Sequence, residues 1–105
     1  MTLERVIHTT PLQRWEGDRG TYYHVVIGNQ AAEAITMHER IRRLELGSRR
    51  GFGSVKVMAR IGDTQWKTSV FPSKTGEWWL LVSRKVIRAE DLALGEMLSV
   101  ELELL

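Results

Sequence analysis

Strict alternation of apolar and polar residues over residues 54–61 (SVKVMARI) is the feature that most constrains the fold of this chain. Side chains with a period of two point to opposite faces of a β-strand, so one face of this segment is apolar and the other is polar. Gly62 and Asp63 form a predicted turn, and the returning strand covers residues 64–71. A last alternating segment covers residues 96–104. The chain is therefore predicted to be mainly β.

Three further segments have the composition of strands. The first strand is predicted over residues 4–15, and it pairs as a hairpin with residues 21–27 across the turn at residues 17–20. Residues 77–82 form a strand that is apolar on both faces, so it is expected to be buried from both sides. Residues 84–91 are expected to form a short helix or a turn. These segments bring the predicted number of strands to six.

One helix of about four turns is predicted after the second strand. Asn29 is a good N-cap residue, and Gly47 supplies a helix stop. Apolar residues recur within the helix at three- and four-residue intervals, and this stripe is expected to face the core. The members of the stripe are Ala34, Met37, Ile41 and Leu44, and it is flanked by Ile35 and His38. Six short strands and one helix predict a single domain over residues 1–105, folded as a small closed or nearly closed β-barrel.

Composition excludes several classes of protein. The sequence contains no cysteine, which excludes a disulfide framework, a thiolate nucleophile and sulfur ligands for a metal. No apolar run approaches the length of about 20 residues that spans a bilayer. The N-terminal residues include charges where a secretory signal peptide is apolar. We therefore expect a cytoplasmic protein with no membrane association.

Basic residues gather in the middle of the chain. Residues 40–90 contain twelve basic and four acidic groups, whereas residues 91–105 contain four acids and no base. A candidate patch for an anion or a nucleic acid consists of Arg49, Arg50, Lys56, Arg60 and Lys67. The alternative is that the acidic last strand lies beside the basic segment and neutralises it. We favour this alternative, because runs of charge are usually solvated surface, so nucleic acid is a candidate partner that is not favoured.

Much of the chain resembles a known family. The resemblance rests on the run RRGFGSVKVMARIGDTQWKTSVFPSKTGEWWLLV, followed by KVIRAEDLALGEMLSVELEL; GTYYHVVI and LELGSRRGFGS fit as well. These segments are similar to the bacterial domain-of-unknown-function family numbered nineteen-oh-five. The resemblance implies a double-split β-barrel, similar in outline to the swapped-hairpin barrels of AbrB- and MazE-type DNA-binding proteins, and it implies no established activity. Leu81 and Ser83 depart from the family pattern, which is expected to have a proline and a lysine there.

The three histidines, of which the third is His38, have no metal-ligand spacing to one another. His8 and His24 lie on the two strands of the predicted first hairpin, where they can face each other and share a proton or a ligand. Such residues more often occupy ordinary strand positions. The glycines of GFGS precede a strand and not a helix, which does not fit a dinucleotide or phosphate loop. No metal, cofactor or catalytic residue is predicted, and we favour a protein that is not an enzyme.

Tryptophans suggest either a filled core or a ligand pocket. Trp66, Trp78 and Trp79 lie on neighbouring predicted strands, and about two or three large rings fill a small barrel, so core packing is the leading interpretation. The alternative is a cavity walled by Trp66, by Trp78 or Trp79, and by Tyr22 or Tyr23. The candidate ligand-binding residues are His8, Tyr23, His24, Trp66 and Trp79.

Three functions remain open on the sequence alone. The favoured one is a non-enzymatic binding or interaction domain, with a homodimer formed through the apolar strands around Trp78 and Trp79. The first alternative is a small-molecule binder or an enzyme that uses a cavity of the barrel. The second is nucleic-acid binding through the basic residues 40–90, which analogy of fold supports only weakly.

Overall fold

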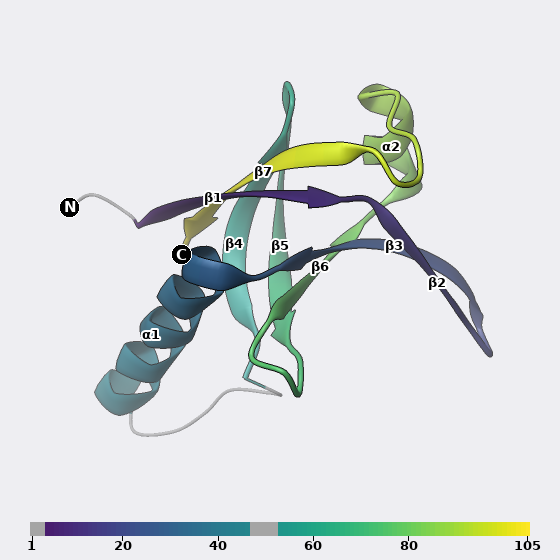
Figure 1. Cartoon of the computed structure of the whole chain (residues 1–105). Helices are drawn as coiled ribbons and strands as arrows, with labels where there is room; N and C mark the ends of the chain where they lie inside the picture. The colour runs from purple at the N-terminus through teal and green to yellow at the C-terminus, as the bar shows by residue number, and fades with distance from the viewer. Residues whose placement is uncertain (1–3, 47–52) are drawn as a thin grey trace.

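The strands of this protein form one antiparallel sheet. A computed structural model describes residues 4–46 and 53–105, and within them the strand order is β1-β7-β4-β5-β6-β3-β2 (Figure 1). In chain order, the elements are β1 (Arg5–Pro11), β2 (Gln13–Gly17), β3 (Gly20–Ile27), α1 (Asn29–Leu46), β4 (Val55–Ile61), β5 (Thr64–Pro72), β6 (Trp78–Val82), α2 (Arg84–Ala89) and β7 (Met97–Leu104).

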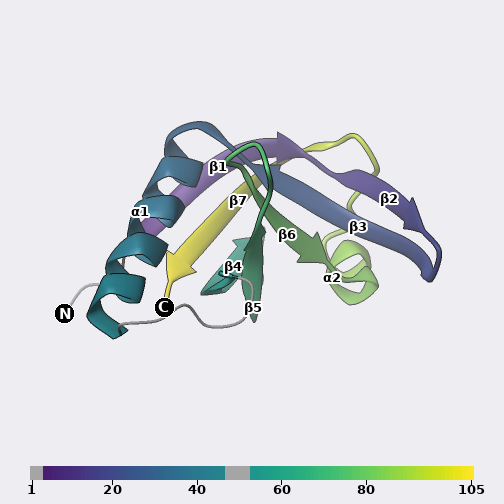
Figure 2. The same ribbon diagram turned by 90° about the horizontal axis from the view of Figure 1, so that it is seen from below.

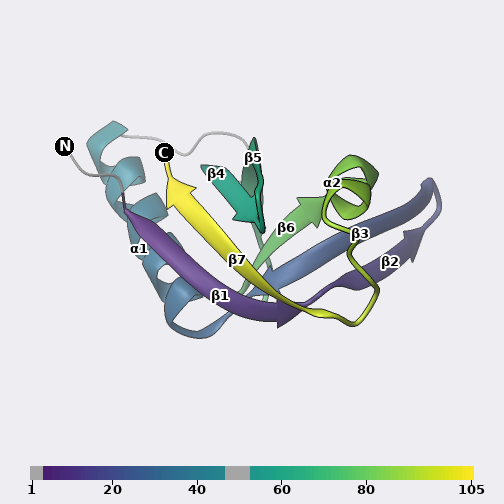
Figure 3. The ribbon, with the colours of Figure 1, turned by 90° about the horizontal axis from the view of Figure 1, so that it is seen from above.

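The mainly β prediction with one long helix is confirmed, but the prediction of six strands in a closed barrel is wrong. The described residues form seven strands in a curled half-barrel (Figures 2 and 3). The predicted first strand divides at Leu12, where the chain changes partner from β7 to β3. Leu12 is buried, and its backbone bonds to Gly95 and Glu96 just before β7. Because of this change of partner, no ladder between β1 and β3 closes the sheet in the described part of the chain.

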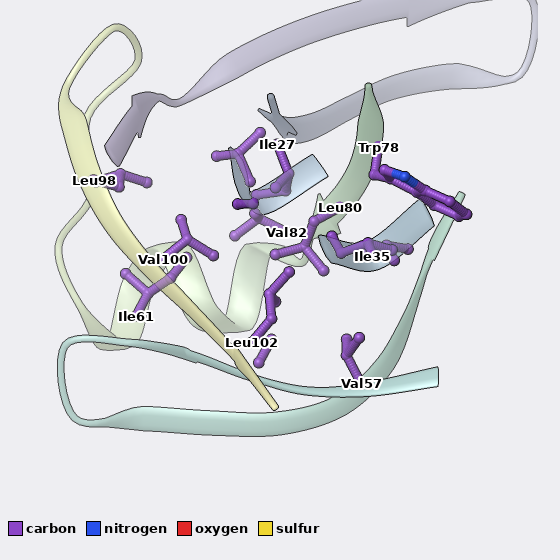
Figure 4. Packing of buried hydrophobic residues seen from close by; sticks show 14 of the residues in the cluster. Ile27, Ile35, Val57, Ile61, Trp78, Leu80, Val82, Leu98, Val100 and Leu102 are labelled. Carbon is purple, nitrogen blue, oxygen red and sulfur yellow. The ribbon is translucent and has the colours of Figure 1, made fainter. Parts of the chain in front are cut away.

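The alternation predicted for β4 and β7 is confirmed by their burial. The core-facing residues of these two strands are Val55, Val57, Ala59, Ile61, Leu98, Val100, Leu102 and Leu104, all buried. Figure 4 shows five of them, Val57, Ile61, Leu98, Val100 and Leu102, around a core that also contains Ile27 and Leu80. Complete burial of an aliphatic side chain contributes about 1.5–3 kcal/mol, so these rows of side chains hold the curl of the sheet.

Helix α1 contains 18 residues, which is about five turns and one more than predicted. The predicted core-facing stripe is wrong, since Met37, Ile41 and Leu44 are exposed to 52%, 47% and 77%. The buried helix residues are Ala31, Ala32 and Ile35. The apolar spacing of the helix is real, but its stripe points to solvent.

Three hydrogen bonds explain the rotation of α1. The indole Nε1–H of Trp78 donates to Thr36 Oγ1 at 3.0 Å, which ties one flank of the helix to β6. His38 Nε2 and Arg42 Nη1 lie 3.2 and 3.0 Å from the carbonyl oxygen of Leu105, just after β7. The side of α1 that bears these polar groups therefore faces the sheet.

Helix α2 agrees with the sequence prediction, whereas strand β6 differs from it in one respect. Residues 84–91 were expected to form a short helix or turn, and α2 confirms this; Ser83 caps the helix, its Oγ accepting from the Val86 N–H at 3.4 Å. Burial of β6 from both sides is wrong, because Leu81 is exposed to 44%. The exposed side of β6 belongs to the outer face of the sheet, which points away from the core.

Candidate ligand-binding groove

The outer face of the sheet, which points away from the core, presents a cluster of large rings. Core-facing residues of β3 have odd numbers, so Tyr22 and His24 lie on the outer face. Core-facing residues of β6 have even numbers, so Trp79 and Leu81 lie on the outer face as well. Trp15 is directly opposite Tyr22 on β2. Strand register therefore gathers side chains from three strands on one surface.

These side chains wall a groove of about 600 Å³. The rings of Trp15 and Tyr22 stack with their centroids 5.7 Å apart, and Phe71 of β5 is opposite Trp79 on the other side. The lining residues are Trp15, Tyr22, His24, Phe71, Pro72, Ser73, Trp79 and Leu81. No Asp, Glu, Lys or Arg is among them, so the groove suits a ligand that is apolar and uncharged over most of its surface.

His24 is the one polar ring of the groove that is almost fully buried. Its side chain is 3% exposed, and its ring stacks on Trp79 with 4.2 Å between centroids and 5° between planes. Burial lowers the pKa of His24, because the charged imidazolium loses its hydration. The imidazole is therefore neutral at pH 7, and its Nδ1 is buried with no hydrogen-bond partner among the described residues. A buried polar atom without a partner is uncommon in folded proteins.

The structure separates the five predicted ligand-binding residues. His24 and Trp79 lie in the groove, whereas His8, Tyr23 and Trp66 lie on the core side of the sheet. His8 is paired with β7, and His24 is paired with β2 and β6. The prediction that the two histidines face each other is therefore wrong, because the register places His24 opposite Gln13 and His8 opposite Val100.

The three residues on the core side have structural contacts. The backbone N–H of Gly28 donates to His8 Nε2 at 3.3 Å, which fixes the chain between β3 and α1. The guanidinium of Arg84 lies over the Tyr23 ring, 5.8 Å from its centroid. Trp66 packs against the hydrophobic core. The packing of Trp66 agrees with the core-packing interpretation of the tryptophans.

Sequence reasoning missed five residues of the groove, which are Trp15, Phe71, Pro72, Ser73 and Leu81. It left Tyr22 as an alternative to Tyr23. The period of two within residues 21–27 already places Tyr22 and His24 on one face, and the same period in residues 77–82 pairs Trp79 with Leu81. These two pairs were the available indication of a shared surface.

The predicted basic patch is partly neutralised. Lys56, Arg60 and Lys67 lie together on the outer face of β4 and β5. Strand β7 lies beside β4, and Arg60 Nε is 3.3 Å from Glu101 Oε2. Arg5 also pairs with Glu101, at 3.3 Å. The acidic last strand therefore adjoins the basic segment, as the favoured alternative predicts.

Arg49 and Arg50, the other members of the predicted patch, lie outside the described residues. Among the residues that are described, no group of three or more His, Asp or Glu is placed to hold a metal ion. Neither described helix is long and apolar enough to cross a membrane.

The fold and the groove together define a small mainly β domain with an open, curled sheet and an aromatic outer surface. Residues 8–102 match the family described as Domain of unknown function (DUF1905), so the chain belongs to this family. The family resemblance expected from the sequence is thereby confirmed. No curated protein matches the chain.

Proposed function

We propose that this protein is a non-enzymatic binding domain whose outer groove holds a flat, uncharged aromatic molecule with an N–H or O–H donor. One observation supports this proposal above the others: a buried imidazole nitrogen without a partner lies in a groove walled by aromatic rings. The rings offer stacking surface to a planar ligand, which aromatic pairs favour by about 0.5–1.5 kcal/mol beyond area burial. The imidazole offers one directed hydrogen bond.

The protonation state of His24 decides which ligand group fits it. We assign the proton of the neutral imidazole to Nε2; Nδ1 then accepts a hydrogen bond, and the ligand donates it. A cationic ligand finds no acid in the lining to pair with, and an anionic ligand finds no Lys or Arg in it. Nδ1 is buried in this structure, so a ligand reaches it only when the imidazole or a neighbouring side chain moves. A bond made at Nδ1 satisfies an atom that has no partner among the described residues.

The test is an NMR titration of the full chain, labelled with nitrogen-15, with indole, adenine and lumichrome. These probes are neutral planar rings with N–H groups. The four tryptophan indole N–H signals are internal reporters. We expect the signals of Trp15 and Trp79 to shift, and those of Trp66 and of Trp78, which is held by Thr36, to stay in place.

Two variants make the titration specific. His24→Phe keeps a ring on Trp79 but removes the acceptor, so it should weaken indole binding about tenfold and leave the binding of N-methylindole, which has no donor, unchanged. Leu81→Ser should weaken all probes, whereas Ile7→Ser, at an exposed apolar position on β1 outside the groove, should not. Absence of shifts with every probe, or shifts centred on Trp66, would refute the proposal.

The same titration tests the nucleic-acid alternative with a single-stranded oligonucleotide at two salt concentrations. Oligonucleotide binding that weakens with salt and shifts the signals around Lys56 and Lys67 would favour that alternative over the groove. In that case the aromatic surface would act as a stacking platform for bases, and the small neutral probes would bind weakly.

A further inference from the structure

Strand β2 forms an uncovered edge of the sheet. It is the last strand in the sheet order, and its side chains at residues 13–16 are exposed. β2 pairs with residues 20–24 of β3, whereas β6 pairs with residues 23–27. The tip of the β2–β3 hairpin therefore extends past β6 as a two-stranded arm, on the side of the molecule away from α1 (Figures 2 and 3). An isolated two-stranded ribbon is only marginally stable in water.

The backbone of β2 presents unpaired groups at two positions. Gly17 and Gly20 are paired across a two-residue turn, so these two residues must exchange hydrogen bonds with each other. Hydrogen-bonded pairs alternate along an antiparallel ladder, so Trp15 also bonds toward β3. The N–H and C=O groups of Arg14 and Glu16 then point to the open edge. Such an edge is a template for another strand.

The charges on this edge are self-complementary. Suppose that two copies of β2 pair antiparallel about a two-fold axis at Trp15. Arg14 of each copy then lies opposite Glu16 of the other, which gives two pairs of opposite charges. Both residues are on the face opposite to Trp15, and within one chain Arg14 Nε is 3.7 Å from Glu16 Oε1 with both side chains exposed. Pairing centred on Arg14 or on Glu16 instead sets like charges against each other, which is destabilising.

We propose that two copies of this chain form a homodimer by antiparallel pairing of their β2 strands about a two-fold axis at Trp15. The register makes residues 14 and 16 the hydrogen-bonded pairs, so all the edge groups of both residues find partners. Trp15 meets its copy in the non-hydrogen-bonded pair, where side chains are closest. Since Trp15 also lines the groove, the two grooves become neighbours across the axis.

The dimer goes beyond the proposed function and needs no ligand, so each proposal can fail alone. The test is sedimentation equilibrium of the full chain without ligand, for the natural sequence and for charge variants. Arg14→Glu alone and Glu16→Arg alone each place like charges opposite twice, and each should raise the dimer Kd about tenfold or more. The double variant Arg14→Glu/Glu16→Arg restores opposite charges and should restore the dimer.

Mixing the two single variants gives the most specific result. Arg14→Glu supplies two acids and Glu16→Arg supplies two bases, so an equimolar mixture should form a heterodimer, detected by native mass spectrometry. A monomeric natural chain at millimolar concentration would overturn the proposal. So would a double variant no better than the single ones, or a mixture that stays monomeric while the natural chain dimerises.

A backbone variant separates strand pairing from other contacts. Glu16→Pro removes an N–H that points to the open edge and leaves the β2–β3 ladder intact, as proline is tolerated at strand edges. The variant should keep the melting temperature of the monomer and lose the dimer. A dimer that persists in this variant would show that a different surface, or a different strand, joins the copies, and would refute pairing through β2.

Discussion

Replacing His24 by Phe should make the protein more stable, although it alters a nearly buried position. The imidazole is 3% exposed and its Nδ1 has no partner among the described residues. Leaving such a polar group unpaired costs about 1–3 kcal/mol, whereas Phe keeps a flat ring on Trp79 and has no polar atom. The open groove beside the ring accommodates the larger side chain. We expect the free energy of unfolding to rise by about 1 kcal/mol, or a few degrees in melting temperature.

The same variant should change how stability depends on pH. Burial lowers the pKa of His24 in the folded protein below the ordinary value of about 6.5, so the unfolded chain binds a proton more readily. Stability from the neutral imidazole is therefore complete above about pH 6.5 and falls as the pH decreases toward the lowered folded pKa. One proton limits this slope to about 1.4 kcal/mol per pH unit. His24→Phe removes this contribution.

The assay is urea unfolding followed by far-ultraviolet circular dichroism, at about pH 7.5 and about pH 5 for both proteins. The free-energy difference between the variant and the natural protein should be positive at the higher pH and larger at the lower one. Far-ultraviolet detection avoids the change in tryptophan fluorescence caused by altering the ring on Trp79. A less stable variant at the higher pH, with the same pH dependence as the natural protein, would refute the reasoning.

Two further substitutions test how α1 is attached. Ile35 is a large apolar side chain of α1 that is fully buried, so Ile35→Ala should lower the free energy of unfolding by about 2–5 kcal/mol. Ile41→Ala on the exposed stripe should change it by less than about 0.5 kcal/mol, and equal effects in urea unfolding would contradict the observed rotation of the helix. Thr36→Val leaves the Trp78 indole N–H without its acceptor and should lower the free energy of unfolding by about 1–3 kcal/mol. Thr36→Ser keeps the hydroxyl and should lower it less. The indole N–H signal of Trp78 should move only in the valine variant.

Local pattern was enough to predict most of the strands. In residues 54–61 and 96–104 each side chain faces the core or the solvent according to the parity of its position, and burial follows that parity. The turn at Gly62 and Asp63 was also predictable, and Gly62 has the positive φ of 60° that such turns favour. These features depend on neighbours in the sequence alone.

The features that were missed depend on contacts between distant residues. Leu12 divides the first strand because its backbone bonds to residues 95–96, which no local pattern indicates. The face of α1 that packs carries buried Ile35 and the hydrogen bonds to Trp78 and to the carbonyl of Leu105, not the apolar stripe. The groove needs the register of four strands at once, so only the pairs within β3 and within β6 were foreseeable.

The pairing of β1 with β7 sets an order of events during synthesis. Val6 is opposite Leu102, which the ribosome adds 96 positions later. At a synthesis rate of about 5–20 residues per second, this strand emerges about 5–20 s before its ladder partner exists. Through that interval the edge of β1 is unpaired, while β2, only a few residues further along, can already form its hairpin with β3. The two strands on either side of Leu12 therefore form at different times. β2 can pair with β3 early in synthesis, whereas β1 pairs only after β7 has been made.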